Sequence, residues 1–381
     1  MRIAIITESF APDINGVAHS VLRVAEHLVA RGHEPLVIAP EPASGARAVT
    51  GPLPYPVLRV PSMPAPGYTR LRLGLPGRSL AGMLRGHGTE VVHLASPFVL
   101  GAQGAAVANA LELPTVAVYQ TDVPAYARAY RLGIVEPLVW RWLRHIHDAA
   151  DRTLAPSTAS ATALHAHGIE RLCLWRRGVD TVRFTPAHRS TALRRALAPN
   201  GEVLVGYVGR LAAEKQVELL APISRLPGVR LVVVGDGPAA GRLRRAMPEA
   251  TFLGTRRGDQ LARIYASLDV FAHPGPYETF GQTIQEALAS GLPVVAPAAG
   301  GPLDLVDSGR TGYLVPPHDA GALAGAVTAL IASPERRIAF GAAARASVEE
   351  RSWAVVGDEL IAHYEAVRAG TVAAKPVPVA V

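Results

Sequence analysis

Residues 270–296 read VFAHPGPYETFGQTIQEALASGLPVVA, which is a strand, a helix and a second strand in a row. The β-rich runs are Val270–His273 and Pro293–Ala296, and a helical pattern lies between them. Short runs of this kind alternate with longer helical patterns along the whole chain. That alternation is typical of parallel sheets with helices on both faces, so we expect an α/β fold with doubly wound sheets.

The other expected strands fall into two groups, one in each half of the chain. They are Ile3–Ile6, Pro35–Ala39, Val91–Leu94, Thr115–Tyr119 and Thr153–Ala155, then Val203–Val208, Arg230–Gly235 and Gly312–Val315. Apolar residues at helical spacing predict a helix over Val17–Arg31, and the last helix is expected over Trp353–Arg368. The proline-rich stretch Gly51–Gly77 has little periodicity and predicts a long surface excursion.

The chain has 381 residues, which predicts two domains at roughly 150 residues each. We place these Rossmann-like domains at residues 1–183 and 184–352. Residues 353–381 are expected to form a helix that crosses back toward the first domain, followed by a flexible tail. Because open α/β sheets bind ligands beyond the carboxyl ends of their strands, we expect the functional site in a cleft between the two domains.

The composition excludes several classes of protein. Cys173 is the single cysteine, so an intrachain disulfide and a CxxC metal or redox site are excluded. The apolar run Ile3–Ile6 is too short for a signal peptide, and Pro97 interrupts the longest uncharged stretch. We therefore expect a cytoplasmic protein that at most rests on a membrane surface.

The net charge of +7 comes almost entirely from arginine, since Lys215 and Lys375 are the only lysines among 38 basic residues. This ratio, in an alanine-rich chain, indicates codon bias in a GC-rich genome rather than nucleic-acid binding. No nucleic-acid partner is therefore expected.

The helix within the opening stretch has the features of a phosphate site. Thr279 followed by Gln282 matches a capping box, so the helix is expected to begin close to Phe280. The backbone N–H groups of Phe280, Gly281 and Gln282 would then point into the cleft at the positive end of the helix dipole. Gly281 would let a phosphate approach the backbone closely.

Two glutamates flank that helix start. Glu286 lies one turn deeper on the face of Gln282, where a carboxylate can accept hydrogen bonds from a ribose diol. Glu278 lies just outside the helix and can hold sugar hydroxyls. The alternative is that both are ordinary acids favoured by the helix dipole.

Cations are expected near the same ligand. Gly209 and Arg210 follow the strand Val203–Val208, and Lys215 is expected at the start of the next helix, where it can clamp a diphosphate. The alternative for Lys215 is a solvated helix start. Gly16, at the end of the loop after the first strand, can bring backbone N–H groups to the other side of a phosphate.

Other motifs narrow the chemistry further. Thr255 and Arg256 follow a strand end and can line a nucleobase pocket, although guanine and uracil are not distinguished. There is no Asp-x-Asp motif and no cluster with metal-ligand spacing, so no metal is expected. Gly235–Gly241 superficially matches a dinucleotide fingerprint, but its spacing is one residue too long and Pro238 alters the turn, which disfavours a nicotinamide-dependent dehydrogenase.

Together these residues carry a family resemblance. The chain resembles the GT-B retaining glycosyltransferases of family 4 over nearly its whole length, through Gly209-Arg210 with Lys215, Gly235-Asp-Gly-Pro238, Glu278-x7-Glu286 and Ala289–Ala296. Within that family it looks most similar to actinobacterial GDP-mannose-dependent α-mannosyltransferases, which are related to sulfoquinovosyltransferases. The motifs shared with this branch are Val118–Asp122, Arg177–Asp180 and Gly300–Asp304.

The resemblance implies roles for these residues. Gly209, Arg210 and Lys215 would bind the donor diphosphate, and Glu286 the ribose. Glu278, with the backbone of residues 280–282, would hold the transferred sugar and distal phosphate, while Gly16 would abut the donor from the other domain. The leaving phosphate would itself deprotonate the acceptor hydroxyl, so catalysis would consist of charge stabilisation and positioning.

One position departs from the family. Many members have a histidine near the sugar where this chain has Gln120, within the sequence Tyr119-Gln-Thr-Asp122. Glutamine can donate and accept hydrogen bonds but cannot become cationic. We expect Gln120 and Asp122 to bind donor-sugar or acceptor hydroxyls, with a purely structural loop as the alternative.

The resemblance implies transfer of mannose from GDP-mannose to a lipid or glycan acceptor. The alternatives are a UDP-sugar donor, carrying glucose, N-acetylglucosamine or sulfoquinovose, and a non-catalytic nucleotide-sugar-binding protein. The complete set Arg210, Lys215, Glu278 and Glu286 argues against the non-catalytic protein, because a degenerate copy would be expected to have lost members.

Two basic segments of the first domain suggest contact with anionic lipid. Arg70, Arg72, Arg78 and Arg85 lie among leucines, and Val139–Arg144 mixes aromatic residues with arginines. Such a surface would place a lipid-linked acceptor on the inner face of the plasma membrane. The alternative is a solvated face above core tryptophans.

Overall fold

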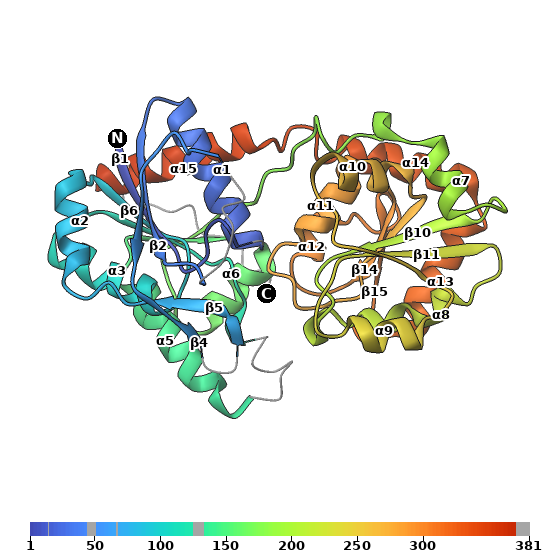
Figure 1. Cartoon of the computed structure of the whole chain (residues 1–381), viewed down its shortest axis with the longest axis horizontal. Coiled ribbons are helices and arrows are strands. Elements are labelled where there is room, and N and C mark those ends of the chain that lie inside the picture. The colour runs from blue at the N-terminus through green and yellow to red at the C-terminus, as the bar shows by residue number, and fades with distance from the viewer. Residues whose placement is uncertain (14, 44–50, 66–67, 125–132, 371–381) are drawn as a thin grey trace. The chain divides into compact units, whose positions relative to one another are not determined.

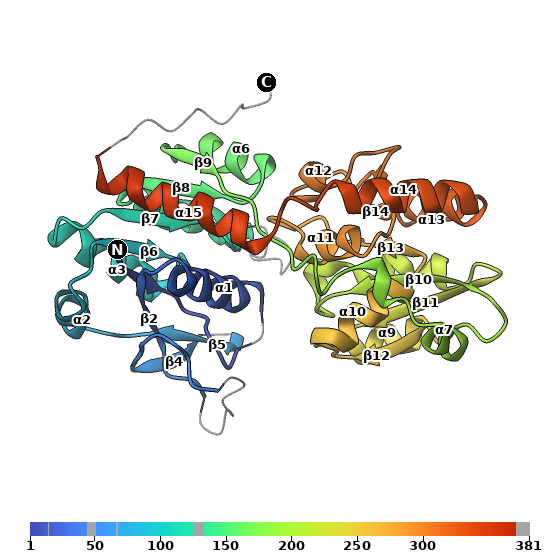
Figure 2. The ribbon, with the colours of Figure 1, turned by 90° about the horizontal axis from the view of Figure 1, so that it is seen from above.

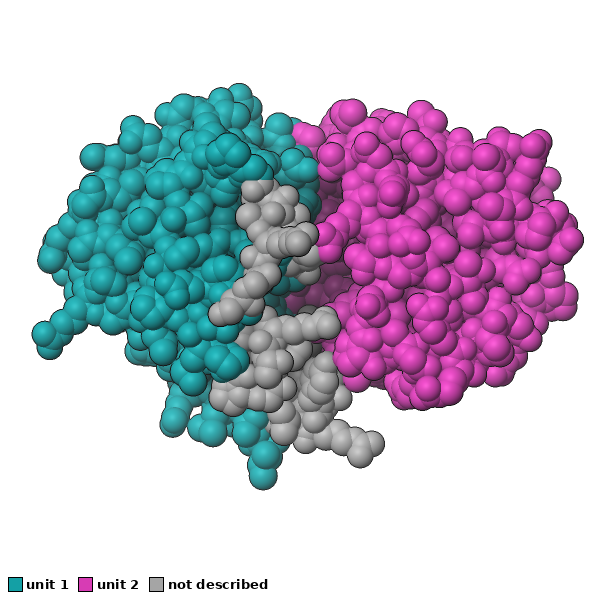
Figure 3. Space-filling view, viewed as in Figure 1, with its two compact units in different colours: residues 1–124, 134–177, 353–381 teal, residues 125–133, 178–352 magenta. Residues whose placement is uncertain are grey.

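A computed structural model describes residues 1–13, 15–43, 51–65, 68–124 and 133–370 (Figure 1). The described residues form two compact units, coloured separately in Figure 3. Unit 1 contains the described residues of 1–124 and 134–177 and those from 353 on, and unit 2 contains Gly133 and residues 178–352. The expected flexible tail, residues 371–381, lies outside the described part.

Unit 1 is built on a seven-stranded parallel sheet with the order β3-β2-β1-β6-β7-β8-β9. Its strands are β1 (Arg2–Ile6), β2 (Glu34–Pro40), β3 (Val57–Val60), β6 (Val91–Leu94), β7 (Thr115–Val118), β8 (Arg152–Ala155) and β9 (Leu172–Leu174). The interior strand β1 shows why this sequence forms the inside of a sheet, because residues 3–6 are apolar and completely buried.

Helices cover both faces of this sheet. One face carries α1 (Gly16–Ala30) and α15 (Trp353–Arg368), which lie side by side in Figures 1 and 2. The other face carries α2 (Ser79–His87), α3 (Val99–Ala110) and α5 (Glu136–Asp148), and α6 (Thr158–Ala166) follows β8. The Asn15 side chain caps α1 by accepting from the N–H groups of Val17 and Ala18, each at 3.0 Å.

The stretch Gly51–Gly77 is only in part the surface excursion that was expected, because it also contains regular structure. This stretch contains the edge strand β3 and an antiparallel pair, β4 (Ser62–Ala65) and β5 (Tyr68–Gly74). Val60 is completely buried and Tyr55 nearly so, so part of the stretch belongs to the core. A four-residue edge strand flanked by prolines has too little periodicity to be recognised, although an edge position tolerates the prolines.

Unit 2 has a six-stranded parallel sheet with the order β12-β11-β10-β13-β14-β15. The strands are β10 (Val203–Val208), β11 (Val229–Val234), β12 (Thr251–Gly254), β13 (Val270–Ala272), β14 (Val294–Pro297) and β15 (Gly312–Val315). Alternate residues of each strand enter the cores on opposite faces.

Helices cover both faces of this sheet as well. One face carries α7 (Thr191–Leu197), α10 (Gly258–Ser267), α11 (Gln282–Ala289) and α14 (Pro334–Ala346). The other carries α8 (Ala221–Ser224), α9 (Ala240–Ala246) and α13 (Ala320–Ile331), and the short α12 (Pro302–Leu305) follows β14. The α/β prediction is therefore confirmed, and the expected strands agree with the observed ones to within one residue at each end.

No helix among the described residues combines the length and apolarity needed to cross a membrane.

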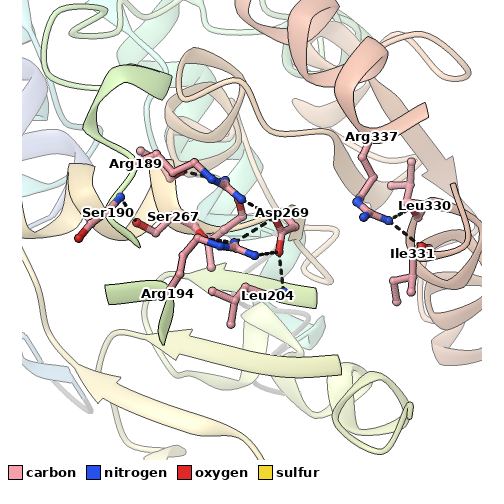
Figure 4. A network of polar contacts seen from close by, with 11 residues as sticks. Arg189, Ser190, Arg194, Leu204, Ser267, Asp269, Leu330, Ile331 and Arg337 are labelled. Carbon is pink, nitrogen blue, oxygen red and sulfur yellow. Dashed lines mark hydrogen bonds and ion pairs between the residues drawn. The ribbon is translucent and has the colours of Figure 1, made fainter. Parts of the chain in front are cut away.

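A partly buried carboxylate joins the start of unit 2 to its sheet (Figure 4). Asp269, just before β13, accepts from the guanidinium groups of Arg189 at 2.8 Å and Arg194 at 2.9 Å and from the backbone N–H of Leu204 at 2.9 Å. Burial alone would raise the pKa of Asp269, but these donors outweigh it and hold the pKa below its usual value. The segment before β10 is thus tied to β10 and β13 through one side chain.

We predict that Asp269→Asn destabilises unit 2 by roughly 2–4 kcal/mol, because two partly buried guanidinium groups lose their counter-charge. Urea unfolding followed by far-ultraviolet circular dichroism measures this. Asp259→Asn is the matched control, because the Asp259 side chain is 90% exposed. Equal midpoints for the two variants would contradict the prediction.

Candidate functional site

The loops that follow β10 and β11 pack backbone against backbone. An added Cβ at Gly235 would lie 1.9 Å from the carbonyl oxygen of Gly209, and one at Gly237 would lie 2.3 Å from that of Leu211. These glycines are therefore required by packing at the carboxyl edge of the sheet. This explains the superficial match to a dinucleotide fingerprint.

The two expected diphosphate ligands lie on the loop after β10. Arg210 donates to Glu214, whose side chain is completely buried, and Lys215 donates to Glu278. Lys215 ends a short 3-10 turn, η3 (Ala213–Lys215), and so does not stand at the start of the next helix as expected. The chain turns again at Gln216, which has φ of 47°, and this breaks the helical pattern.

Glu278 joins this loop to the one after β13. Its Oε1 accepts from the Lys215 ammonium and lies 3.1 Å from His273 Nε2. Burial by itself would raise the pKa of Glu278, but Lys215 and His273 outweigh it and hold the pKa well below the usual range. Gly275 allows the approach, since an added Cβ there would lie 3.2 Å from the Lys215 backbone. Glu278 is therefore an ionised carboxylate within a cationic setting.

The helix α11 begins later than predicted. It starts at Gln282, and the N-cap is Gly281 with φ of 100°, without a side-chain capping bond. Glycine adopts this left-handed conformation readily, so it takes the cap in place of Thr279. Phe280 is then free to enter the core, where it is 2% exposed. The first-turn N–H groups of the helix accordingly start at Gln282, two residues after the expected start.

Glu286 lies one turn into α11, hydrogen-bonded by Tyr265 and Gln282. Burial raises the pKa of Glu286 to about 8, although both hydrogen bonds act in the opposite direction. The Gln282 amide also donates to the carbonyl oxygen of Gly178 at 3.1 Å. At neutral pH this carboxyl is therefore mostly protonated, in contrast to Glu278.

Thr255 and Arg256 are exposed directly after β12, at the carboxyl edge of the same sheet. The Arg256 guanidinium donates to the carbonyl oxygen of Thr255 at 3.0 Å. The structure thus places both residues at the edge that carries Arg210 and Glu278, at the end of the outermost strand.

In unit 1 the expected residues also follow strands. Gly16 opens α1, and Gln120 and Asp122 follow β7. Tyr119 donates to Asp122 at 3.1 Å, and Gln120 donates to the carbonyl oxygen of Ala95 at 3.3 Å. The side chains of Tyr119 and Gln120 are buried, whereas that of Asp122 is partly exposed.

Sequence reasoning gave no role to Arg177, Glu214, His273 or Glu8, which the structure places beside the expected residues. Glu8, after β1, is 2% exposed and accepts from the backbone N–H groups of Leu100 and Gly101 at the start of α3. Burial raises the pKa of Glu8 to about 8. Each of the four follows a strand or lies between a strand and a helix, and this position could have pointed to them. Arg177 also belongs to the motif Arg177–Asp180, which was noted without a role for the arginine.

Within the described ranges, no three histidine, cysteine or carboxylate side chains come together as they would around a metal ion.

Two family descriptions match the chain. Glycosyltransferase Family 4 matches residues 14–183, and Glycosyl transferases group 1 matches residues 202–333. The GDP-mannose-dependent alpha-mannosyltransferase of Mycobacterium tuberculosis is 51% identical over 370 residues, which covers 97% of this chain and 97% of that protein. The protein of the same name from Mycolicibacterium smegmatis is 51% identical over 372 residues, covering 96% and 98%.

Among solved structures, Anabaena HepE in complex with UDP superposes with a TM-score of 0.78. It is 21% identical and covers 96% of this chain and 100% of that one. This structural similarity shows that the chain has the GT-B fold, in which each of two domains is built on its own sheet.

The raised pKa of Glu286 predicts a pH-dependent stability. The unfolded carboxyl has a pKa of 4.5, so between about pH 5 and pH 8 the folded protein keeps a proton that the unfolded chain has released. This contribution is complete below pH 4.5 and is lost as the pH rises through about 8. Because Glu286→Gln stays neutral, its melting temperature relative to the wild type should be higher at pH 8.5 than at pH 5.5.

Thermal melts at the two pH values measure this difference. The control is Glu335→Gln, an exposed carboxyl on α14 whose substitution should shift both melts equally. The same offset between Glu286→Gln and the wild type at both pH values would rule out a raised pKa.

Proposed function

Because the chain belongs to glycosyltransferase family 4, we propose that it transfers mannose from GDP-mannose, with retention of configuration, to a hydroxyl of a lipid-linked or glycan acceptor. The observation that carries the proposal is the joining of Lys215 to Glu278 at the carboxyl edge of the unit 2 sheet. The Lys215 ammonium, which can bind a diphosphate, thus touches the Glu278 carboxylate, which can bind sugar hydroxyls. The relatives at 51% identity support mannose and guanine as the donor's parts.

In this proposal the donor diphosphate lies against Arg210 and Lys215. Each cation already touches a carboxylate, Glu214 for Arg210 and Glu278 for Lys215, so the diphosphate adds a further anionic partner to each. Charge accumulates on the leaving diphosphate in the transition state, and two positioned cations stabilise it. The chain's own cations thus supply this charge stabilisation, so the proposal includes no metal.

The two glutamates of the motif then have different tasks. Glu278, ionised, accepts hydrogen bonds from hydroxyls of the transferred sugar. Glu286, mostly protonated in the free protein, can both donate to and accept from the ribose diol. The first-turn N–H groups of α11, from Gln282 onward, face the distal phosphate.

The reaction needs no separate protein base in this proposal. The leaving phosphate takes the proton of the acceptor hydroxyl on the same face of the sugar, so retention follows. The protein's task in unit 1 is positioning, for which Gln120 and Asp122 bind donor-sugar or acceptor hydroxyls and Gly16 abuts the donor. Thr255 and Arg256 line the nucleobase pocket.

An exposed apolar stripe in unit 1 supports contact with an anionic membrane. Ile134, Leu138 and Trp142 are 92%, 56% and 44% exposed and recur every four residues along the turn η1 (Gly133–Val135) and α5. Arg141 and Arg144 are exposed on the same helix. Apolar residues flanked by arginines on one helix are typical of an interfacial helix, which would bring a lipid-linked acceptor to the enzyme.

The two basic segments that suggested contact with anionic lipid contain both buried and exposed residues. Trp140 is buried and stacks on His167 at 3.6 Å, so the core-tryptophan alternative holds for it but not for Trp142. In the other segment Arg72 binds the Ser62 side chain at 2.7 Å within the β4–β5 pair. Arg78 and Arg85 are exposed, and the Arg70 side chain lies outside those that the structure describes.

The donor is tested by incubating the protein separately with GDP-mannose, UDP-glucose and UDP-N-acetylglucosamine and measuring hydrolysis. We expect GDP-mannose to turn over fastest and Lys215→Met to lower that rate by roughly 100-fold or more. Arg242→Met, an exposed arginine on α9, is the matched control and should retain the wild-type rate. Faster turnover of a UDP-sugar would select the alternative donor, and no turnover of any donor would favour a non-catalytic protein.

For the membrane contact, we predict that Ile134→Ser combined with Leu138→Ser lowers binding to phosphatidylglycerol vesicles by about tenfold or more, since two apolar side chains no longer enter the interface. Co-sedimentation measures the bound fraction. Val182→Ser removes an apolar side chain that is 83% exposed in unit 2, and it should bind as the wild type does. Equal binding of all proteins to phosphatidylcholine and phosphatidylglycerol would contradict the contact.

A further inference from the structure

Arg177 is a buried arginine at the carboxyl edge of the unit 1 sheet. It follows β9 and is 7% exposed. Its Nη2 donates to Gln120 Oε1 at 2.7 Å, and its Nη1 donates to the carbonyl oxygen of Gly16 at 3.2 Å. One guanidinium therefore joins the segments that follow β1, β7 and β9, and two of those segments carry residues assigned above to substrate.

The glycine at position 16 is explained by this arginine. Its φ is not in the left-handed region, so the backbone conformation does not require glycine. An added Cβ would instead lie 3.0 Å from Arg177 Nη1, closer than ordinary van der Waals contact. The absence of a side chain at Gly16 thus makes room for the guanidinium.

The same guanidinium determines how the Gln120 amide is turned. Arginine has only donors, so the amide oxygen must face it and the amide nitrogen must face away. The nitrogen then donates to the carbonyl oxygen of Ala95 at 3.3 Å. A hydrogen bond accepted from a charged donor polarises the amide and strengthens its N–H groups as donors.

We propose that Arg177 is a positioning residue of the transfer reaction, holding the Gly16 backbone and the Gln120 amide in the arrangement that addresses a sugar hydroxyl. This inference rests on the proposed function and extends it to a residue that does not touch substrate. The N–H of the Gln120 amide can donate to a neutral hydroxyl oxygen, whereas the charged Arg177 guanidinium contacts the amide oxygen and not the substrate. Since the side chains proposed to bind the nucleotide all lie in unit 2, and Gly16 contributes only its backbone, loss of Arg177 should reduce turnover far more than nucleotide affinity.

The test compares kcat for GDP-mannose turnover with the Kd for GDP. Arg177→Met should lower kcat roughly thirtyfold or more, because a small displacement of positioned groups has a large effect on rate. The Kd for GDP should stay within about twofold of the wild type. Arg177→Lys should recover part of kcat, because an ammonium keeps the charge but cannot serve both acceptors as the guanidinium fork does. Arg176→Met, the neighbouring arginine, is the matched control and should keep the wild-type kcat.

A double-mutant cycle checks that Arg177 acts through Gln120. If it does, Arg177→Met with Gln120→Met should have the kcat of the slower single variant within about threefold. The proposal would be overturned if the two single-variant losses in kcat multiplied in the double variant. It would also be overturned if the Kd for GDP rose by the same factor as kcat fell.

A second variant covers the case in which Arg177→Met does not fold. Gly16→Ala places a methyl group against the guanidinium without removing its charge, and it should also lower kcat at unchanged Kd. Wild-type kcat in Gly16→Ala would refute the inference. If the wild-type protein turned over no nucleotide sugar, the proposed function would fail first; an active wild type with equally active Arg177 variants would refute this inference alone.

Discussion

Backbone segments at the carboxyl edge of the unit 2 sheet approach one another more closely than any side chain would allow. Gly209 and Gly235 meet where a Cβ would lie 1.9 Å from a carbonyl oxygen, and Gly275 lies against the Lys215 backbone. This contact draws the loop after β10 onto the loops after β11 and β13. The ion pair between Lys215 and Glu278, and with it the whole candidate donor site, depends on that approach.

Two glutamates eight positions apart in one motif have pKa values shifted in opposite directions. Glu278 has a cation and a histidine against its carboxylate, so its charge is retained despite burial. Glu286 has the neutral donors Tyr265 and Gln282, which are too weak to offset burial, and its pKa rises to about 8. The two glutamates therefore differ in function because their environments differ. Glu278 can only accept hydrogen bonds from hydroxyl groups, whereas Glu286 can also donate them.

In unit 1 the corresponding constraint is a single guanidinium. Arg177 reaches the segments after β1 and β7 from the end of β9, and Gly16 leaves it the space. A parallel sheet makes this possible, because strands that are distant in sequence all end at the same edge. In the same region the buried Glu8 carboxyl accepts a hydrogen bond from the Leu100 N–H at the N-terminus of α3.

The sequence by itself determined the α/β class and most strands of the two sheets, because runs of buried apolar residues are set by neighbours along the chain. Its local motifs also singled out Arg210, Lys215, Glu278 and Glu286. It missed β3–β5, whose short and proline-flanked strands have almost no periodicity. It also misplaced the start of α11, since a capping box and a left-handed glycine compete there and packing of Phe280 favours the glycine. Only the tertiary structure decided which side chains meet and which are buried: Lys215 contacts Glu278, Arg177 needs Gly16 and orients Gln120, and burial raises the pKa of Glu286. Those outcomes depend on burial and on contacts between segments far apart in the chain, which no local pattern encodes.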